Sequence, residues 1–131
     1  MESLNQISEK LLNKRVELEN LEDSYHRSNN NLAEQVYDLE QKRSDLENLL
    51  QETYETTSYD LRQDDSVNEE SFMAMNQIFT FFQTELDEEF AKEYRILLDQ
   101  EEELRQEYLK KRQILQDSVE QLQQKNTAYK H

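Results

Sequence analysis

The stretch TTSYDLRQDDSVNE, residues 56–69, separates two long segments that both have apolar residues at heptad-like spacing. It is rich in Thr, Ser, Asp and Asn, whose side chains compete for backbone hydrogen bonds and favour turns. Ser66 and Glu69 have the spacing of a capping box, which marks the start of a helix. The sequence therefore predicts a first helix over about 3–56, a connection over about 57–65 and a second helix over about 66–126.

The composition points to long helices. The chain has 131 residues, enough for one domain, and it contains neither glycine nor proline. Phosphate-binding loops, nucleophile elbows and tight hairpins need glycine, so those architectures are excluded. The residues that dominate instead, such as Glu, Gln, Leu and Lys, are good helix formers. We predict an all-α fold.

Apolar seams run along both segments. In the first helix, one seam repeats every seven residues from Leu4 to Thr53, and a more polar one repeats from Ile7 to Leu49. Apolar positions of the second helix extend from Phe72 to Leu122. After Leu86 they twice step by four residues, which is a stutter in the heptad pattern.

Folding the chain at the connection brings apolar positions side by side over its whole length. In the predicted alignment Tyr25 lies opposite Leu97, and Leu39 lies opposite Phe82. This coincidence favours two long helices in an antiparallel, coiled-coil-like hairpin over one continuous rod.

The segment FMAMNQIFTFF, residues 72–82, holds four of the five phenylalanines. A two-helix hairpin needs one seam from each helix, but a second apolar stripe lies beside the seam here, and aromatic residues and Met are enriched at protein interfaces. Two interpretations stand: these side chains flank the hairpin core under the stems of long neighbours, or they bind a helical protein. The predicted partner-binding residues are Phe72, Met75, Ile78, Phe79, Phe81, Phe82, Leu86 and Phe90.

The charge argues against several classes of partner. Thirty acidic residues against fifteen basic ones give a net charge of −15, spread along the chain, so we expect no binding to nucleic acid. The longest uncharged run, residues 71–84, is too short and too polar for membrane insertion. The N-terminal MESLNQISEK lacks the apolar core of a signal peptide, so we expect a cytoplasmic protein, with export alongside a partner left open.

No group of residues suggests catalysis. The chain has no cysteine, and its acidic runs fit a solvated helix face. Di-iron bundles use Glu-x-x-His from two helices, whereas Asp23 and His26 are the one near match and His131 is terminal. We expect a protein that is not an enzyme and that has no cofactor and no metal site.

The overall plan resembles the small helical accessory proteins of LXG toxins, which are exported by the type VII secretion system. The charged tract LLDQEEELRQEYLKKRQIL, residues 97–115, looks like the Glu/Arg/Lys-rich tract of one such family. The resemblance implies a hairpin that binds the helical N-terminal domain of the toxin, with a second small helical protein as a further candidate partner. It would place the toxin contact around the phenylalanine-rich segment.

Two motifs of the related hairpins are missing. The chain has no Trp-x-Gly, and none of its seven tyrosines begins a Tyr-x-x-x-Asp/Glu export signal. Phe81 and Glu85 approach the similar Phe-x-x-x-Asp signal, but not at the C-terminus. The resemblance thus implies an adaptor or chaperone without its own signal. The alternative is a self-assembling structural coiled coil, such as a homodimeric four-helix bundle or a scaffold.

Overall fold

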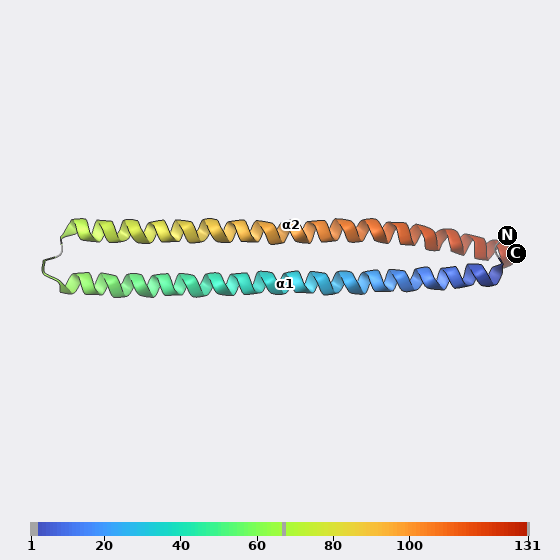
Figure 1. The fold of residues 1–131 in the computed structure, drawn as a ribbon, viewed down its shortest axis with the longest axis horizontal. Coiled ribbons are helices and arrows are strands. Elements are labelled where there is room, and N and C mark those ends of the chain that lie inside the picture. The colour runs from blue at the N-terminus through green and yellow to red at the C-terminus, as the bar shows by residue number, and fades with distance from the viewer. Residues whose placement is uncertain (1–2, 67, 131) are drawn as a thin grey trace. The chain divides into compact units, whose positions relative to one another are not determined.

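Two long helices form the fold of this computed structural model, which describes residues 3–66 and 68–130. Helix α1 spans Leu4–Gln63 and helix α2 spans Glu69–Lys130. They pack against each other as an antiparallel hairpin (Figure 1). The predicted all-α hairpin is confirmed.

Side-chain caps start both helices. At the beginning of α1, the Ser3 hydroxyl accepts a hydrogen bond from the Gln6 amide (3.2 Å), and the Ser3 amide donates to Gln6 Oε1 (2.9 Å). This reciprocal pair is a capping box that the sequence analysis missed. At the beginning of α2, Asn68 Oδ1 accepts a hydrogen bond from the Ser71 amide at 3.2 Å. Each cap satisfies backbone donors that have no partner within the first turn of the helix.

The turn lies later in the chain than predicted. Helix α1 continues to Gln63 because its buried face continues: Ser58 is buried and Leu61 is half-buried. Ser66 does not cap α2; its amide and its hydroxyl both donate to Asp64 Oδ1, at 3.0 and 2.6 Å. These bonds lower the pKa of Asp64. The sequence correctly indicated a polar turn but identified the wrong cap.

Moving the turn also changes which residues face each other. Tyr25 stacks on Tyr108, with ring centroids 4.1 Å apart, and does not lie opposite Leu97 as predicted. The reason is geometric: moving the centre of the turn by about five residues moves every facing partner by about ten, or roughly three helical turns. Leu39 is buried as expected, but Phe82, its predicted partner, is largely exposed.

The hairpin divides into two compact units, through both of which the helices run. The terminal unit comprises residues 1–33 and 99–131, and the turn unit comprises residues 34–98. In the terminal unit, Ile7 and Leu11 of α1 form a buried cluster with Leu122 of α2, and Val119 packs against it. The buried hydrophobic residues of the turn unit are Leu39, Met75 and Phe90.

Candidate partner-binding surface

An open apolar groove lies between the two helices of the turn unit. It has a volume of about 360 Å³ and is lined by Leu46, Leu49, Leu50 and Thr53 of α1 and by Phe79, Phe82 and Leu86 of α2. Leu49 is 58 % exposed and Phe82 is 53 % exposed. We refer to this surface as the apolar groove. Its walls come from both helices, so it depends on the hairpin being closed.

The eight predicted partner-binding residues separate into three groups by exposure. Met75 and Phe90 are buried inside the hairpin and already serve its core. Those that are half-buried are Phe72, Phe79 and Leu86. Those that are exposed are Ile78, Phe81 and Phe82. The groove brings Phe79, Phe82 and Leu86 together, and the Phe81 ring meets the Phe82 ring edge-on at 5.9 Å.

The predicted partner-binding residues all lie on α2, although the sequence already shows Leu49 and Leu50 of α1 as an apolar doublet that widens the apolar face. The heptad analysis placed Leu49 in a continuous seam with Gln35. In the structure the partly buried positions step by four from Leu32 to Val36, and the seam then passes through Leu50. This change of phase turns Leu49 outward. The sequence already indicates this change of phase, because Gln35, which the heptad repeat places in the seam, is polar, whereas its neighbour Val36 is apolar.

Polar side chains line the other side of the same contact. Leu50 and Phe79 also line a second depression, whose remaining lining is mostly polar, so they lie between the two surfaces. There the Tyr54 hydroxyl is 2.9 Å from Asn76 Oδ1, to which it donates. The Tyr54 ring meets Phe79 edge-on at 5.2 Å. This second depression is also open and is almost as large as the apolar groove, at about 350 Å³, but its lining is mostly polar, whereas that of the apolar groove is nearly all apolar.

One arginine ties the two helices together in the turn unit. Arg43 Nε donates to Glu47 Oε1 at 3.0 Å, and its Nη2 donates to Asp87 Oδ1 at 3.2 Å. The guanidinium also lies over the Phe90 ring, 5.9 Å from its centroid. The hydrogen bond to Glu47 raises the pKa of Arg43 above its usual value. Arg43 thus occupies a seam position while its charge stays paired.

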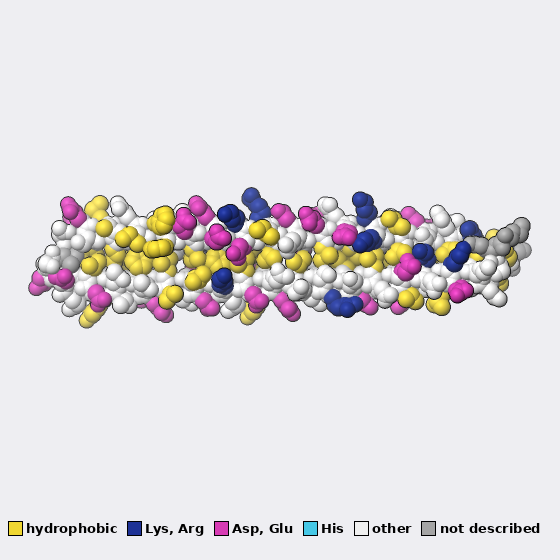
Figure 2. Space-filling view, in the orientation of Figure 1, with side chains coloured by type: hydrophobic (Ala, Val, Ile, Leu, Met, Phe, Trp, Pro, Cys, Tyr) yellow, Lys and Arg dark blue, Asp and Glu magenta, His cyan; other side chains and the backbone are white. Residues whose placement is uncertain are grey.

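The net negative charge is less evenly spread along the chain than the sequence analysis indicated, and most of it lies in the turn unit. Residues 34–98 carry 17 Asp and Glu against 5 Lys and Arg, a net charge of −12. Residues 1–33 and 99–131 carry 13 against 10, a net charge of −3. Figure 2 shows hydrophobic side chains along the contact between the helices, with Asp and Glu side chains beside them. The turn unit is therefore an acidic body with an apolar groove.

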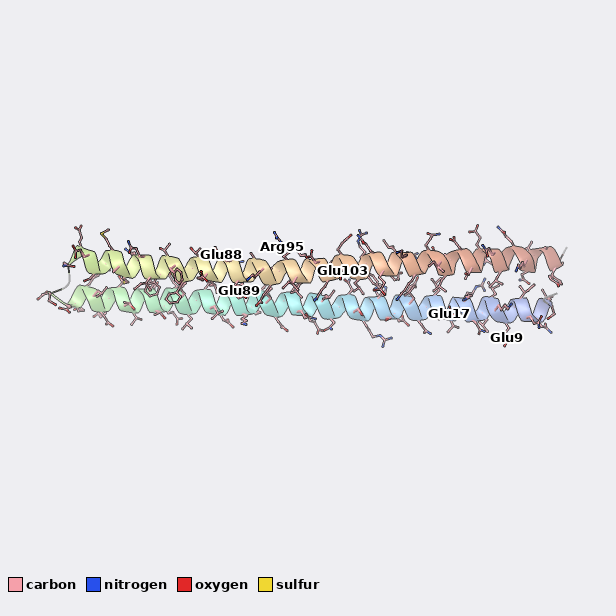
Figure 3. All side chains as sticks on the ribbon, turned by 45° about the horizontal axis from the view of Figure 1, so that its top comes forward. Glu9, Glu17, Glu88, Glu89, Arg95 and Glu103 are labelled. Carbon is pink, nitrogen blue, oxygen red and sulfur yellow. The ribbon has the colours of Figure 1, made fainter. Side chains whose placement is uncertain are left out.

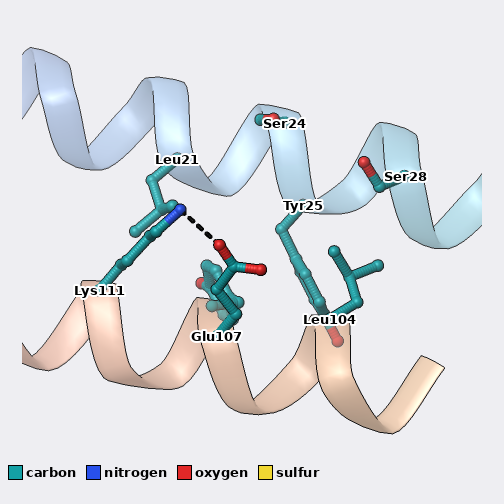
Figure 4. A pocket seen from close by; sticks show the side chains of 8 residues that line it. Leu21, Ser24, Tyr25, Ser28, Leu104, Glu107 and Lys111 are labelled. Carbon is teal, nitrogen blue, oxygen red and sulfur yellow. Dashed lines mark ion pairs between the residues drawn. The ribbon is translucent and has the colours of Figure 1, made fainter. Parts of the chain in front are cut away.

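The terminal unit has a smaller and more polar depression of about 180 Å³ (Figure 4). An ion pair of 2.8 Å between Lys111 Nζ and Glu107 Oε1 lies at its edge and lowers the pKa of Glu107. The stacked rings of Tyr25 and Tyr108 also line it. Because its two charged groups pair with each other and its volume is half that of the apolar groove, this depression is the weaker candidate for binding.

In residues 3–66 and 68–130, no group of three or more His, Asp or Glu side chains could hold a metal ion. No helix within these ranges is both long enough and apolar enough to cross a membrane.

Comparisons with protein families, curated proteins and solved structures found no match to this chain. The function proposed for this chain therefore rests on the chemistry and geometry of the apolar groove.

Proposed function

We propose that this protein is a non-catalytic adaptor that binds a helical segment of another protein in the apolar groove. The observation that carries the proposal is the outward position of Leu49 and Phe82 in an open groove whose lining is apolar apart from Thr53. An exposed apolar surface with a polar surround is typical of a protein interface. A hairpin of two helices also has little core of its own, and a third helix would bury more apolar area.

A helix suits this groove better than an extended peptide. Backbone groups inside α1 and α2 are paired along each helix, so they offer no open edge to a strand. Recognition must then come from side chains, as when an amphipathic helix places its apolar face in a groove. The lining residues span about two turns of each helix, which would accommodate anchors at positions i, i+3 or i+4, and i+7.

The resemblance to LXG-associated proteins makes the proposal more specific. In this form, the partner is the helical N-terminal domain of an LXG toxin, bound in the cytoplasm, and the adaptor delivers it to a type VII secretion system. The charged tract at residues 97–115 and the hairpin plan support this assignment.

A binding experiment with a matched control tests both the general proposal of a helical partner and the specific proposal of an LXG toxin domain. Leu49→Asp places a charge in the groove, whereas Leu98→Asp makes the same change at a residue of equal exposure (59 %) that does not line the groove. We expect Leu49→Asp to abolish capture of the toxin domain and Leu98→Asp to retain it, with helix content preserved in both by circular dichroism. Unchanged binding by a folded Leu49→Asp variant would refute the groove as the site. Failure of the wild-type protein to bind the toxin domain would refute the toxin assignment.

Self-assembly is the alternative function, with a second copy covering the groove. The charge of the turn unit weighs against it, because two copies that pair through this surface would place two turn units, each with a net charge of −12, against each other. Light scattering over a concentration series distinguishes the two. We expect a monomer at low micromolar concentration; a stable dimer that Leu49→Asp dissociates would favour the structural coiled coil.

A further inference from the structure

We propose that the apolar groove is specific for a basic amphipathic helix, with apolar anchors on one face and Lys or Arg along both flanks. This inference rests on the proposed function, because it takes the occupant to be a helix of another protein, and it adds the chemistry of that helix. The charges that border the groove support this specificity.

Acidic side chains border the groove on α1. Asp45 lies four residues before Leu49 and Glu52 lies three residues after it, so both are its neighbours on the helix surface. Both carboxylates are exposed. Lys42, four residues before Leu46, is the basic residue on this border.

Acidic side chains also border the groove on α2. Glu85 lies three residues after Phe82, and Glu89 lies three residues after Leu86. Figure 3 labels Glu88 and Glu89 on α2, and both are exposed. The two helices thus place carboxylates on both sides of an apolar floor.

Within the part of the chain that the structure describes, no Lys or Arg side chain forms an ion pair with these carboxylates. Among the described residues, the ion pairs of the turn unit join Arg43 to Glu47 and to Asp87, on the polar side of the helix contact. Asp45, Glu52, Glu85 and Glu89 take part in none of the ion pairs of the described chain. The groove therefore presents unpaired negative charge to whatever enters it.

The net charge separates the candidate occupants. A second copy of this chain that paired through the same surface would bring another turn unit with a net charge of −12, and like charges facing each other across an interface are unfavourable. A helix with Lys or Arg on its flanks would place cations within a Debye length of four carboxylates, about 8 Å at physiological salt. Charge complementarity therefore favours the basic helix, while the apolar floor supplies burial.

The test compares two synthetic helical peptides with the same apolar face, one flanked by lysine and the other by glutamate. Binding to the full-length protein is followed by fluorescence anisotropy of the labelled peptide at low and at high salt. We expect the lysine peptide to bind at least about tenfold more tightly than the glutamate peptide, since the exposed carboxylates attract its lysines and repel the glutamates of the other peptide. We expect high salt to reduce this difference.

Charge reversal on the protein supplies the decisive variant. The double variant Glu52→Lys, Glu85→Lys should lose affinity for the lysine peptide and gain affinity for the glutamate peptide. The control Glu9→Lys, Glu103→Lys makes the same change of net charge at exposed residues of the terminal unit (Figure 3) and should leave the preference as it is. A change in fold cannot explain a gain of binding to the opposite peptide.

The outcomes separate this inference from the function on which it rests. Equal binding of both peptides, abolished by Leu49→Asp, would refute the charge specificity and leave helix binding supported. Equal effects of the two double variants would also refute it, because the attraction would then follow net charge alone. Absence of binding by either peptide would overturn both proposals.

Discussion

Replacement of Phe90 and of Phe82 by alanine should have very different effects on stability, although both are phenylalanines of α2 in the turn unit. Phe90 is 4 % exposed and Phe82 is 53 % exposed. Phe90→Ala removes a buried ring and leaves a cavity, which costs about 3–5 kcal/mol of unfolding free energy. Phe82→Ala removes a ring that is about half buried, so the loss should be about 1 kcal/mol, half of the 1.5–3 kcal/mol for full burial. The expected difference between the variants is about 2–4 kcal/mol.

Urea unfolding followed by far-UV circular dichroism measures this difference at a fixed protein concentration. With a slope of about 2 kcal/mol per molar urea, the midpoint of Phe90→Ala should lie at least about 1 M below that of Phe82→Ala. Binding of the helical partner should show the reverse order, because Phe82 lines the apolar groove and Phe90 does not. Equal midpoints for the two variants would contradict the assignment of Phe90 to the core and Phe82 to the surface.

Two further predictions concern the alignment of the helices and the turn. Because the chain has no native cysteine, a short thiol crosslinker should join Tyr25→Cys to Tyr108→Cys within one chain, as seen by gel mobility, and should not join Tyr25→Cys to Leu97→Cys. The opposite pattern would restore the alignment predicted from sequence. In the turn, Ser66→Ala removes the hydroxyl hydrogen bond to Asp64 and keeps the one from the backbone amide, so NMR titration should show the Asp64 pKa rising part of the way toward its ordinary value. In the wild-type protein these bonds stabilise the turn above the ordinary Asp64 pKa, and the stabilisation is lost as pH falls through the lowered one; an unchanged pKa in the variant would contradict this.

The hairpin could be predicted from sequence because the features that produce it are properties of short segments and recur along the chain. The absence of glycine and proline, the abundance of helix formers and the apolar seams each indicate two long helices. The position of the turn could not be read in the same way. Ser58 belongs to a residue type that favours turns, yet it is buried within α1, because packing against the second helix overrides local preference.

The candidate site was predicted in outline, and its composition needed the structure. The phenylalanine-rich segment does contribute to an exposed surface, but α1 supplies the other wall through Leu46 and Leu49. This wall forms because the buried seam of α1 shifts by one residue at Val36. A strict seven-residue repeat does not detect such a shift. The hydrogen bond between Tyr54 and Asn76 depends on the alignment of the two helices. Because the turn was predicted at the wrong position, this pair could not be predicted from the sequence.

The uneven charge of the two units also bears on how fast partners meet. The turn unit, with its net charge of −12, attracts cationic surfaces before contact. Such steering can raise association rates well above those of neutral pairs. The same field repels polyanions, so encounters with nucleic acid or anionic lipid would be brief. A cationic helix would arrive preferentially at the turn unit, where the apolar groove lies, so most of its collisions would begin near the surface that can hold it.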